Sequence, residues 1–218
     1  MDKQSLTRLK INTYSNYALL FIRMLVSIIT IPWLLKGFGE VGYGVFTLAF
    51  GLLASFSFLE LGAGKTILRF GGEYRADRNK AKFKEAVNVA VNLIVYATGA
   101  LVLILLLIAI FHRQLFTISE LSFEESLAVF LLATGFGAIV FFEIITTNLL
   151  HAFENFWQRN ILLLVKTILL LFLAFMVVNE KFDLVHYAGF VLAVEVFFFA
   201  GDWVLIKRNQ SSPRLGFR

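Results

Sequence analysis

The residues 100–111, ALVLILLLIAIF, form an unbroken apolar run in which apolar and polar side chains do not alternate. A transmembrane β-strand alternates between lipid-facing and lumen-facing side chains, so its sequence alternates as well. The run continues towards residue 86, and about 20 apolar residues are enough for an α-helix to cross a bilayer. This stretch therefore predicts a membrane-spanning helix.

The composition extends the prediction to the whole chain. Of 218 residues, 59% are hydrophobic and 16% are charged, and the mean hydropathy is +0.79. A soluble domain is about half apolar and about a quarter charged. So few polar groups cannot cover the apolar surface in water, and we expect the chain to be solvated by lipid. It has no cysteine, which excludes disulfides and thiolate metal sites.

Six apolar runs are long enough to cross a bilayer. The fold class predicted is therefore an all-α integral membrane protein, with a six-helix membrane unit over residues 1–206 and a basic tail over 207–218. The expected spans are 18–35, 45–64, 86–111, 126–150, 161–178 and 187–206.

The basic residues beside these spans predict the orientation. Fifteen lysines and arginines fall on the side that holds both termini, and three (Lys36, Arg113 and Lys181) fall on the other side. Loops rich in lysine and arginine stay in the cytoplasm. We therefore expect both termini to be cytoplasmic, and the basic connection 65–86 to be a cytoplasmic loop.

Two glycine-rich segments look like nucleotide-binding motifs. GAGKT (62–66) ends like a phosphate-binding loop, but the first glycine of that motif would fall on Leu59, and GFGEVG (37–42) lies between two expected spans. Both motifs need a strand before the loop and a helix after it. We interpret both segments as turns at helix ends, where glycine adopts angles that other residues avoid.

The stretch IPWLLKGFGEVGYGVFTLAFGLLASFSFLELGAGKTILRFGGEYR (31–75) carries a different pattern. It resembles the first helical hairpin of the Wzx-type polysaccharide and oligosaccharide flippases, within the superfamily of multidrug and polysaccharide exporters. Glu60 departs from this pattern, because family members more often have aspartate there. The matching features are Pro32, Gly39, the turn Gly42-Tyr43-Gly44, the acidic-Leu-Gly element at 60–62, and Arg69 at the start of a basic loop.

The resemblance implies a transporter of the bacterial inner membrane that moves lipid-pyrophosphate-linked oligosaccharide, with membrane lipid as surroundings and with no cofactor and no nucleic acid. Such flippases resemble two facing six-helix lobes, and this chain supplies the N-terminal one. It would be a fragment, a truncated product, or a half-transporter that forms a homodimer. The alternatives are a scaffold of a polysaccharide assembly complex and a membrane-embedded polyprenyl-phosphate glycosyltransferase.

Four charges inside the expected spans need an explanation, because each costs about 2.5–3.5 kcal/mol at membrane depth. They are Arg23, Glu143, Lys166 and Glu195. Arg23 and Lys166 are candidates for binding a phosphate headgroup in a cavity open to the cytoplasm, with Glu143 or Glu195 carrying a coupling ion. The alternative is that Arg23–Glu143 and Lys166–Glu195 are structural ion pairs. Glu60 and Asp202 are expected to be solvated at the membrane boundary.

A polar stripe accompanies Arg23 on the first span. Asn12, Asn16, Ser27 and Thr30 share one helical face with it, and we expect that face to point away from lipid. Asn88 and Asn92 repeat the spacing on the third span and complete the predicted headgroup cavity with Asn16, Ser27 and Lys166. Pro32 is expected to bend the first helix near Ile28.

The three histidines, at positions 112, 151 and 186, are scattered and have no carboxylate cluster beside them. We therefore predict no metal site and no catalytic residues.

Overall fold

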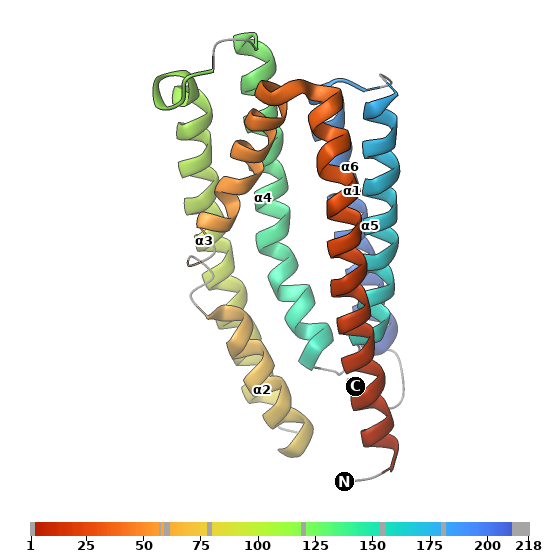
Figure 1. Cartoon of the computed structure of the whole chain (residues 1–218). Helices are drawn as coiled ribbons and strands as arrows, with labels where there is room; N and C mark the ends of the chain where they lie inside the picture. Colours follow the sequence, from red (N-terminus) through yellow and green to blue (C-terminus); the bar gives the residue numbers. More distant parts are fainter. Residues whose placement is uncertain are drawn as a thin grey trace.

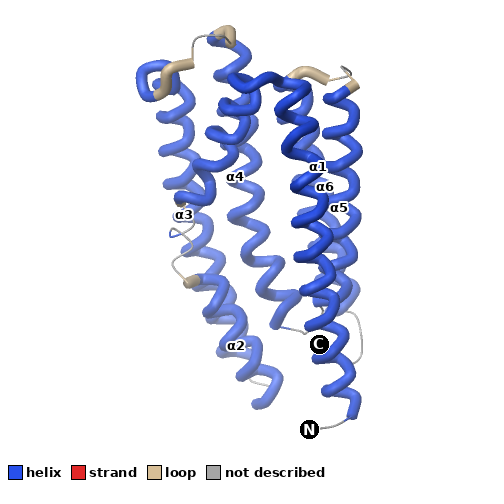
Figure 2. The backbone as a smooth tube through the Cα atoms, in the orientation of Figure 1, coloured by secondary structure: helices blue, strands red, loops and turns tan. Residues whose placement is uncertain are grey.

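The computed structural model describes residues 3–56, 58, 62–77, 80–118, 121–152, 156–179 and 182–210. All regular structure in these residues is helical, as Figure 2 shows. The helices are α1 (Lys3–Ser55), α2 (Ala63–Asp77), α3 (Lys80–Leu115), α4 (Phe123–Ala152), α5 (Phe156–Val178) and α6 (Leu184–Gln210).

The helix α1 reverses its direction at Gly39. This residue has φ 71° and ψ 175°, and it is the interior residue of α1 with non-helical angles. The chain runs up to this turn and then back down (Figure 1, red to orange), so we distinguish a first arm, residues 3–38, from a second arm, residues 40–55. The turn predicted at Gly39 is confirmed. Pro32 lies inside the helical first arm, and the bend near Ile28 remains a prediction, while Gly42 and Gly44 lie inside the helical second arm instead of in a turn.

Five helices within the described residues are long and apolar enough to cross a membrane: Lys10–Ser55, Ala81–Leu115, Phe123–Ala152, Trp157–Val178 and Leu184–Arg208. The helical membrane class is therefore supported. The first two expected spans both fall in α1, and the second, 45–64, does not continue as one helix, because α1 ends at Ser55 and α2 begins at Ala63. Six spans and the N-in/C-in orientation remain predictions.

The described residues of the basic segment, 65–77 and 80–86, are helical where a loop was expected. They form most of α2 and the beginning of α3. One face of α2 carries Ala63 and Ile67, both completely buried against α3 and α4, while Lys65 and Arg69 are exposed on the other face. Burial of this apolar face stabilises the helix, because most helical stability in proteins comes from packing an amphipathic face.

The GAGKT segment is a turn that starts a helix. Gly62 has φ 74°, and its carbonyl accepts a hydrogen bond from the Thr66 N–H at 3.0 Å in the first turn of α2. The described residues before it belong to α1 and not to a strand. The exclusion of a phosphate-binding loop therefore stands, with the turn opening α2 instead of closing the preceding span.

Local sequence signals explain where α4 begins. The Ser122 hydroxyl accepts a hydrogen bond from the Glu125 N–H, and Glu125 Oε2 accepts one from the Ser122 N–H, each at 3.1 Å. This reciprocal arrangement is a capping box, which satisfies backbone donors at a helix start.

The bundle has two sides joined by α4. The first arm of α1 packs along α5, while α2 and α3 pack against the opposite side of α4, and α4 also packs against α6 (Figure 1). Two glycines permit close approaches: a Cβ at Gly37 would clash with Val177 of α5, and one at Gly137 of α4 would clash with Leu53 of the second arm. This arrangement places the charged residues of α1, α4, α5 and α6 in the same part of the bundle.

Candidate functional site

Helices α5 and α6 face each other through two ion pairs. Lys166 Nζ lies 2.6 Å from Glu195 Oε2, and Arg159 Nε lies 3.4 Å from Asp202 Oδ2. Arg159 lies seven residues before Lys166 on α5, and Asp202 lies seven residues after Glu195 on α6. These opposite offsets are those of two antiparallel helices. Residues seven apart lie on one helical face, so each helix presents both of its charges to the other.

Glu143 of α4 connects these two pairs. Its Oε1 lies 3.2 Å from Arg159 Nη2, and its carboxyl group also lies within interaction range of the Glu195 carboxyl group. One helical turn further along α4, the Thr146 hydroxyl donates a hydrogen bond to Asp202 Oδ2 at 3.3 Å. We call Glu143, Arg159, Lys166, Glu195 and Asp202 the charged cluster.

The charged cluster is almost fully shielded from solvent. Exposure is 1% for Glu195, 3% for Asp202 and 9% for Arg159. Desolvating a charge costs several kcal/mol per ion unless partners compensate. Mutual pairing of the five side chains across α4, α5 and α6 supplies this compensation and fixes how the three helices meet.

The expected solvation of Asp202 is wrong. Asp202 is buried against Arg159 and Thr146, because α6 continues past it to Gln210 with this face turned towards α4 and α5. Arg159 is one of the fifteen basic residues expected on the side that holds both termini, and neither Arg159 nor Asp202 is among the predicted site residues. Arg159 lies seven residues from Lys166, and Asp202 lies seven residues from Glu195. These spacings place each pair on one helical face and could have indicated that all four charges belong to one site. Glu60 lies outside the described residues.

Arg23 is not a member of the ion pairs that make up the charged cluster. Arg23 is exposed on the first arm of α1, and its guanidinium interacts electrostatically with Glu143, Glu195 and Arg159. The alternative Arg23–Glu143 ion pair is wrong, because the structure pairs Glu143 with Arg159, whereas the Lys166–Glu195 pair is present. Within the described residues no ion pair engages the Arg23 guanidinium, which leaves it accessible to a ligand.

The polar stripe on the first arm lies along one edge of the α1–α5 contact. Asn12 is buried in that contact, while Asn16 accepts a hydrogen bond from Asn160 Nδ2 of α5 at 2.6 Å. Ser27 is exposed, and its hydroxyl donates to the Arg23 carbonyl oxygen at 2.9 Å. The stripe thus continues from the α5 contact to the exposed Arg23 and Ser27.

Asn88 and Asn92 are not brought to Arg23 by any described contact. Both are exposed on α3, on the side opposite to its buried residues Ala90, Ile94 and Leu101. Their part in a headgroup cavity remains a prediction.

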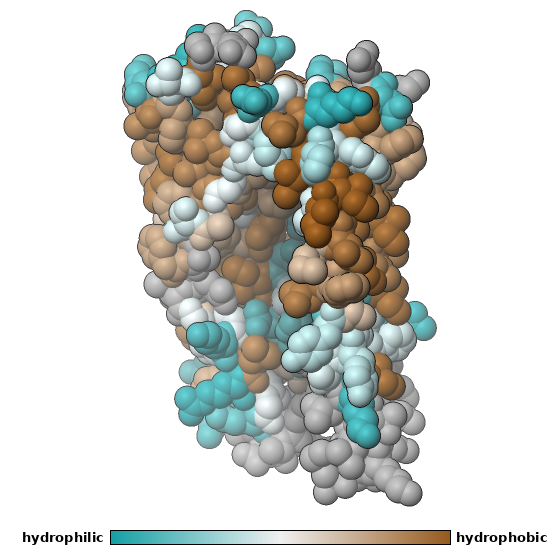
Figure 3. All heavy atoms as spheres, in the orientation of Figure 1, coloured by the Kyte–Doolittle hydropathy of each residue, from teal (hydrophilic) through white to brown (hydrophobic). Residues whose placement is uncertain are grey.

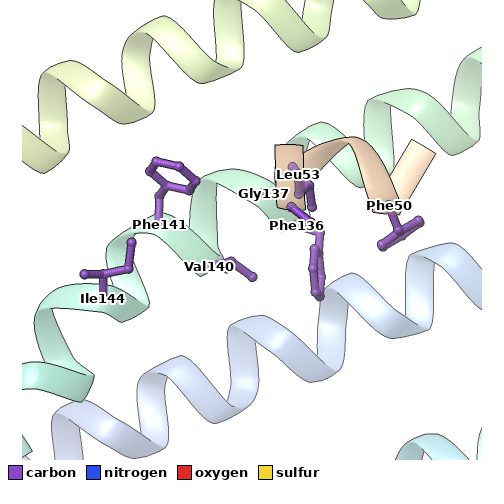
Figure 4. A pocket seen from close by; sticks show the side chains of 8 residues that line it. Phe50, Leu53, Phe136, Gly137, Val140, Phe141 and Ile144 are labelled. Carbon is purple, nitrogen blue, oxygen red and sulfur yellow. The ribbon is translucent and has the colours of Figure 1, made fainter. Parts of the chain in front are cut away.

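An apolar groove of about 240 Å³ lies between the second arm of α1 and α4 (Figure 4). On α4, Val140 and Ile144 of the groove lie three residues before and one residue after Glu143 in the sequence. Figure 3 shows the corresponding side of the molecule hollowed between the first arm of α1 and the side formed by α3, with brown and teal atoms at depth. The groove is lined by Phe50, Leu53, Ala54, Phe136, Gly137, Val140, Phe141 and Ile144.

The described residues offer a cationic donor group and, separately, an apolar groove. An exposed guanidinium provides paired donors for phosphate oxygens, and the apolar groove accepts a hydrocarbon portion. The part of the chain that the structure describes contains no group of three histidine, cysteine or carboxylate side chains arranged to hold a metal.

Comparison with known proteins gives one partial similarity. A stretch of 66 residues is 38% identical to a Salmonella typhi protein named "Putative O-antigen transporter". The match spans 29% of this chain and 15% of that relative's length. No protein-family model and no solved structure matches the chain.

Proposed function

We propose that this chain is one lobe of a flippase in the bacterial inner membrane that moves lipid-pyrophosphate-linked oligosaccharide units for surface polysaccharide biosynthesis. The observation that carries the proposal is the exposed Arg23 guanidinium, which interacts with the buried charged cluster and forms no ion pair within the described residues. The named relative and the resemblance of residues 31–75 to flippase hairpins support it.

Arg23 is the headgroup contact in this proposal. Lys166 is engaged by Glu195 at 2.6 Å, so it serves mainly to hold α5 against α6. Asn16 and Ser27 lie on the same stripe as Arg23 and line the path along which the headgroup moves. Pro32 and the turn at Gly39 shape the first arm that presents these residues.

The proposal also includes a second lobe, because transporter repeats close around a central site and move against each other. The first arm of α1 has the surface for such a partner. Its exposed apolar residues include Tyr14, Tyr17, Leu20, Phe21 and Ile28. The second lobe is either a further part of one polypeptide or a second copy of this chain, and it would cover the hollow side of the bundle.

The test compares Arg23→Ala and Arg23→Lys in a strain whose glycan export depends on this protein. A hydrogen bond to a charged group contributes about 1.5–3 kcal/mol, so Arg23→Ala should lower export about tenfold or more at equal protein level. Arg23→Lys should give an intermediate value, because lysine keeps the charge and loses the paired donors. Arg69→Ala, an exposed arginine on α2, is the control. Full export by Arg23→Ala would remove Arg23 from the site.

A further inference from the structure

The carboxyl groups of Glu143 and Glu195 lie together inside the bundle. Glu195 is 1% exposed, and the side chain of Glu143 is 12% exposed. The two groups interact electrostatically across the contact between α4 and α6. Two interacting carboxylates in a low-dielectric site repel each other strongly when both are ionised.

Each of these two carboxyl groups has an oxygen without a hydrogen-bond partner. Among the described residues, neither Glu143 Oε1 nor Glu195 Oε1 accepts a hydrogen bond. Lys166 occupies the other oxygen of Glu195, and Arg159 approaches Glu143 Oε1 at 3.2 Å without hydrogen-bond geometry. Unsatisfied buried polar atoms are rare in proteins. A proton bound to one of these oxygens would supply a hydrogen-bond donor inside the charged cluster.

The number of charges in the charged cluster also favours one bound proton. Glu143, Glu195 and Asp202 carry three negative charges when ionised, against two positive charges on Arg159 and Lys166. One bound proton makes the charged cluster itself neutral, and Arg23, which interacts with Glu143 and Glu195 from its exposed position on α1, is a further positive charge outside these ion pairs. Asp202 is the poorer site for the proton, because it accepts a hydrogen bond from Thr146 and faces Arg159.

We propose that Glu143 and Glu195 share one proton at neutral pH and form a buried proton-binding site between α4 and α6. The proton forms an O–H bond to one carboxylate oxygen and a hydrogen bond to the other, and its release leaves two carboxylates. The charged groups that surround the site are Lys166 and Arg159 of α5, Asp202 of α6, Arg23 of α1, and His151 of α4, which interacts with Arg159.

Release of the proton would leave the charged cluster with one uncompensated negative charge near Arg23. That charge would compete with an anionic ligand for the guanidinium, so proton and anion would favour each other's binding. This consequence depends on the proposed function of Arg23, whereas the proton site itself does not.

The test is infrared spectroscopy of the purified full chain in lipid nanodiscs at pH 7. A protonated carboxyl group absorbs separately from carboxylates, and exposed glutamates are ionised at this pH. We expect a protonated-carboxyl band that shifts when glutamate, but not aspartate, carries a ¹³C label at its carboxyl carbon. Absence of such a band in the unmodified chain would overturn the proposal without any need for a variant.

Variants then locate the proton. Glu143→Gln and Glu195→Gln should each abolish the band, while Glu40→Gln, which alters an exposed glutamate near the Gly39 turn, should keep it. A band that survives in a folded, monodisperse Glu195→Gln protein, or one that disappears in Glu195→Gln but persists in Glu143→Gln, would overturn a shared proton. If a variant fails to fold, the isotope shift in the unmodified chain still decides whether a glutamate is protonated.

Exchange of K⁺ for Na⁺ at constant ionic strength separates a proton from a metal cation. The band should be unchanged under the proposal, and its loss in Na⁺ would identify a sodium site instead. The infrared result does not depend on the export assay. If the band is present and Arg23→Ala exports normally, the proton site is retained and the proposed headgroup contact is rejected.

Discussion

At the scale of single residues, Arg159 compensates two carboxylates at once. It contacts Glu143 at 3.2 Å and Asp202 at 3.4 Å, from α5 to both α4 and α6. Removing one partner of a buried ion pair leaves uncompensated charge, which costs much more than losing an exposed pair.

Arg159→Leu should therefore lower the free energy of unfolding by about 3–5 kcal/mol. Arg159→Lys should cost less, because it keeps the positive charge and loses the donors that reach two helices. Thermal unfolding in detergent, followed by size-exclusion chromatography, measures both. The matched control is Arg69→Leu, whose side chain is 77% exposed and whose change should stay within about 0.5 kcal/mol. Equal loss of stability in the two leucine variants would contradict the prediction.

Asp183 controls a helix start through its ionisation. Its Oδ1 accepts a hydrogen bond from the His186 N–H at the beginning of α6 at 2.8 Å, and His186 Nδ1 lies 2.8 Å from the same oxygen. The backbone hydrogen bond lowers the pKa of Asp183 below its ordinary value, and the contact with the His186 ring lowers the pKa further.

Because the folded-state pKa of Asp183 is lowered, its capping contribution is complete above the unfolded-state pKa, about 3.9. It is lost as pH falls through the folded-state pKa. Asp183→Ala should cost about 1 kcal/mol at pH 7, and this difference should shrink below about pH 4. Asp183→Asn keeps an acceptor oxygen, so it should cost less and show no such pH dependence. Denaturant titrations at several pH values provide the check; a constant difference between Asp183→Ala and the parent would refute it.

At the scale of elements, the reversal of α1 depends on one backbone position. Gly39 has φ 71° and ψ 175°, and a Cβ there would meet no atom within 4 Å. A side chain at position 39 is therefore disfavoured by the backbone conformation and not by a clash, because only glycine adopts this conformation easily.

Gly39→Ala should reduce stability by about 1–3 kcal/mol. Gly44→Ala is the matched control: Gly44 is helical, and a Cβ there also meets nothing within 4 Å. In a helix, alanine is favoured over glycine by about 0.5–1 kcal/mol, so this variant should be neutral or stabilised. Unfolding in detergent measures the stability of both variants. If Gly39→Ala is as stable as the parent, α1 reverses without needing a residue that favours positive φ.

At the scale of the whole molecule, the Gly39 turn and the beginning of α3 lie at opposite ends of the bundle (Figure 1). Glu40, beside the turn, and Lys84, near the start of α3, are both exposed. The excess of lysine and arginine around 65–86 predicts that the α3 start faces the cytoplasm.

The chain contains no cysteine, so single cysteines can be placed without altering native thiols. Glu40→Cys in intact cells should react with a membrane-impermeant maleimide, and Lys84→Cys should react only after the membrane is opened. The cysteine-free parent is the background control. Labelling of Lys84→Cys in intact cells would reverse the predicted orientation.

The sequence by itself determined the class of the molecule. Long apolar runs without alternation require helices in lipid, because a helix satisfies its backbone hydrogen bonds internally where no water is present. The cost of a charge at membrane depth also identified Arg23, Glu143, Lys166 and Glu195 as residues that need partners, and the glycine pattern located the turn at Gly39.

Only the tertiary structure decided who the partners are. Arg159 and Asp202 lie near the ends of apolar runs, where the sequence does not tell a buried charge from a solvated one. Their burial follows from the antiparallel register of α5 and α6 and from the packing of α4 across both.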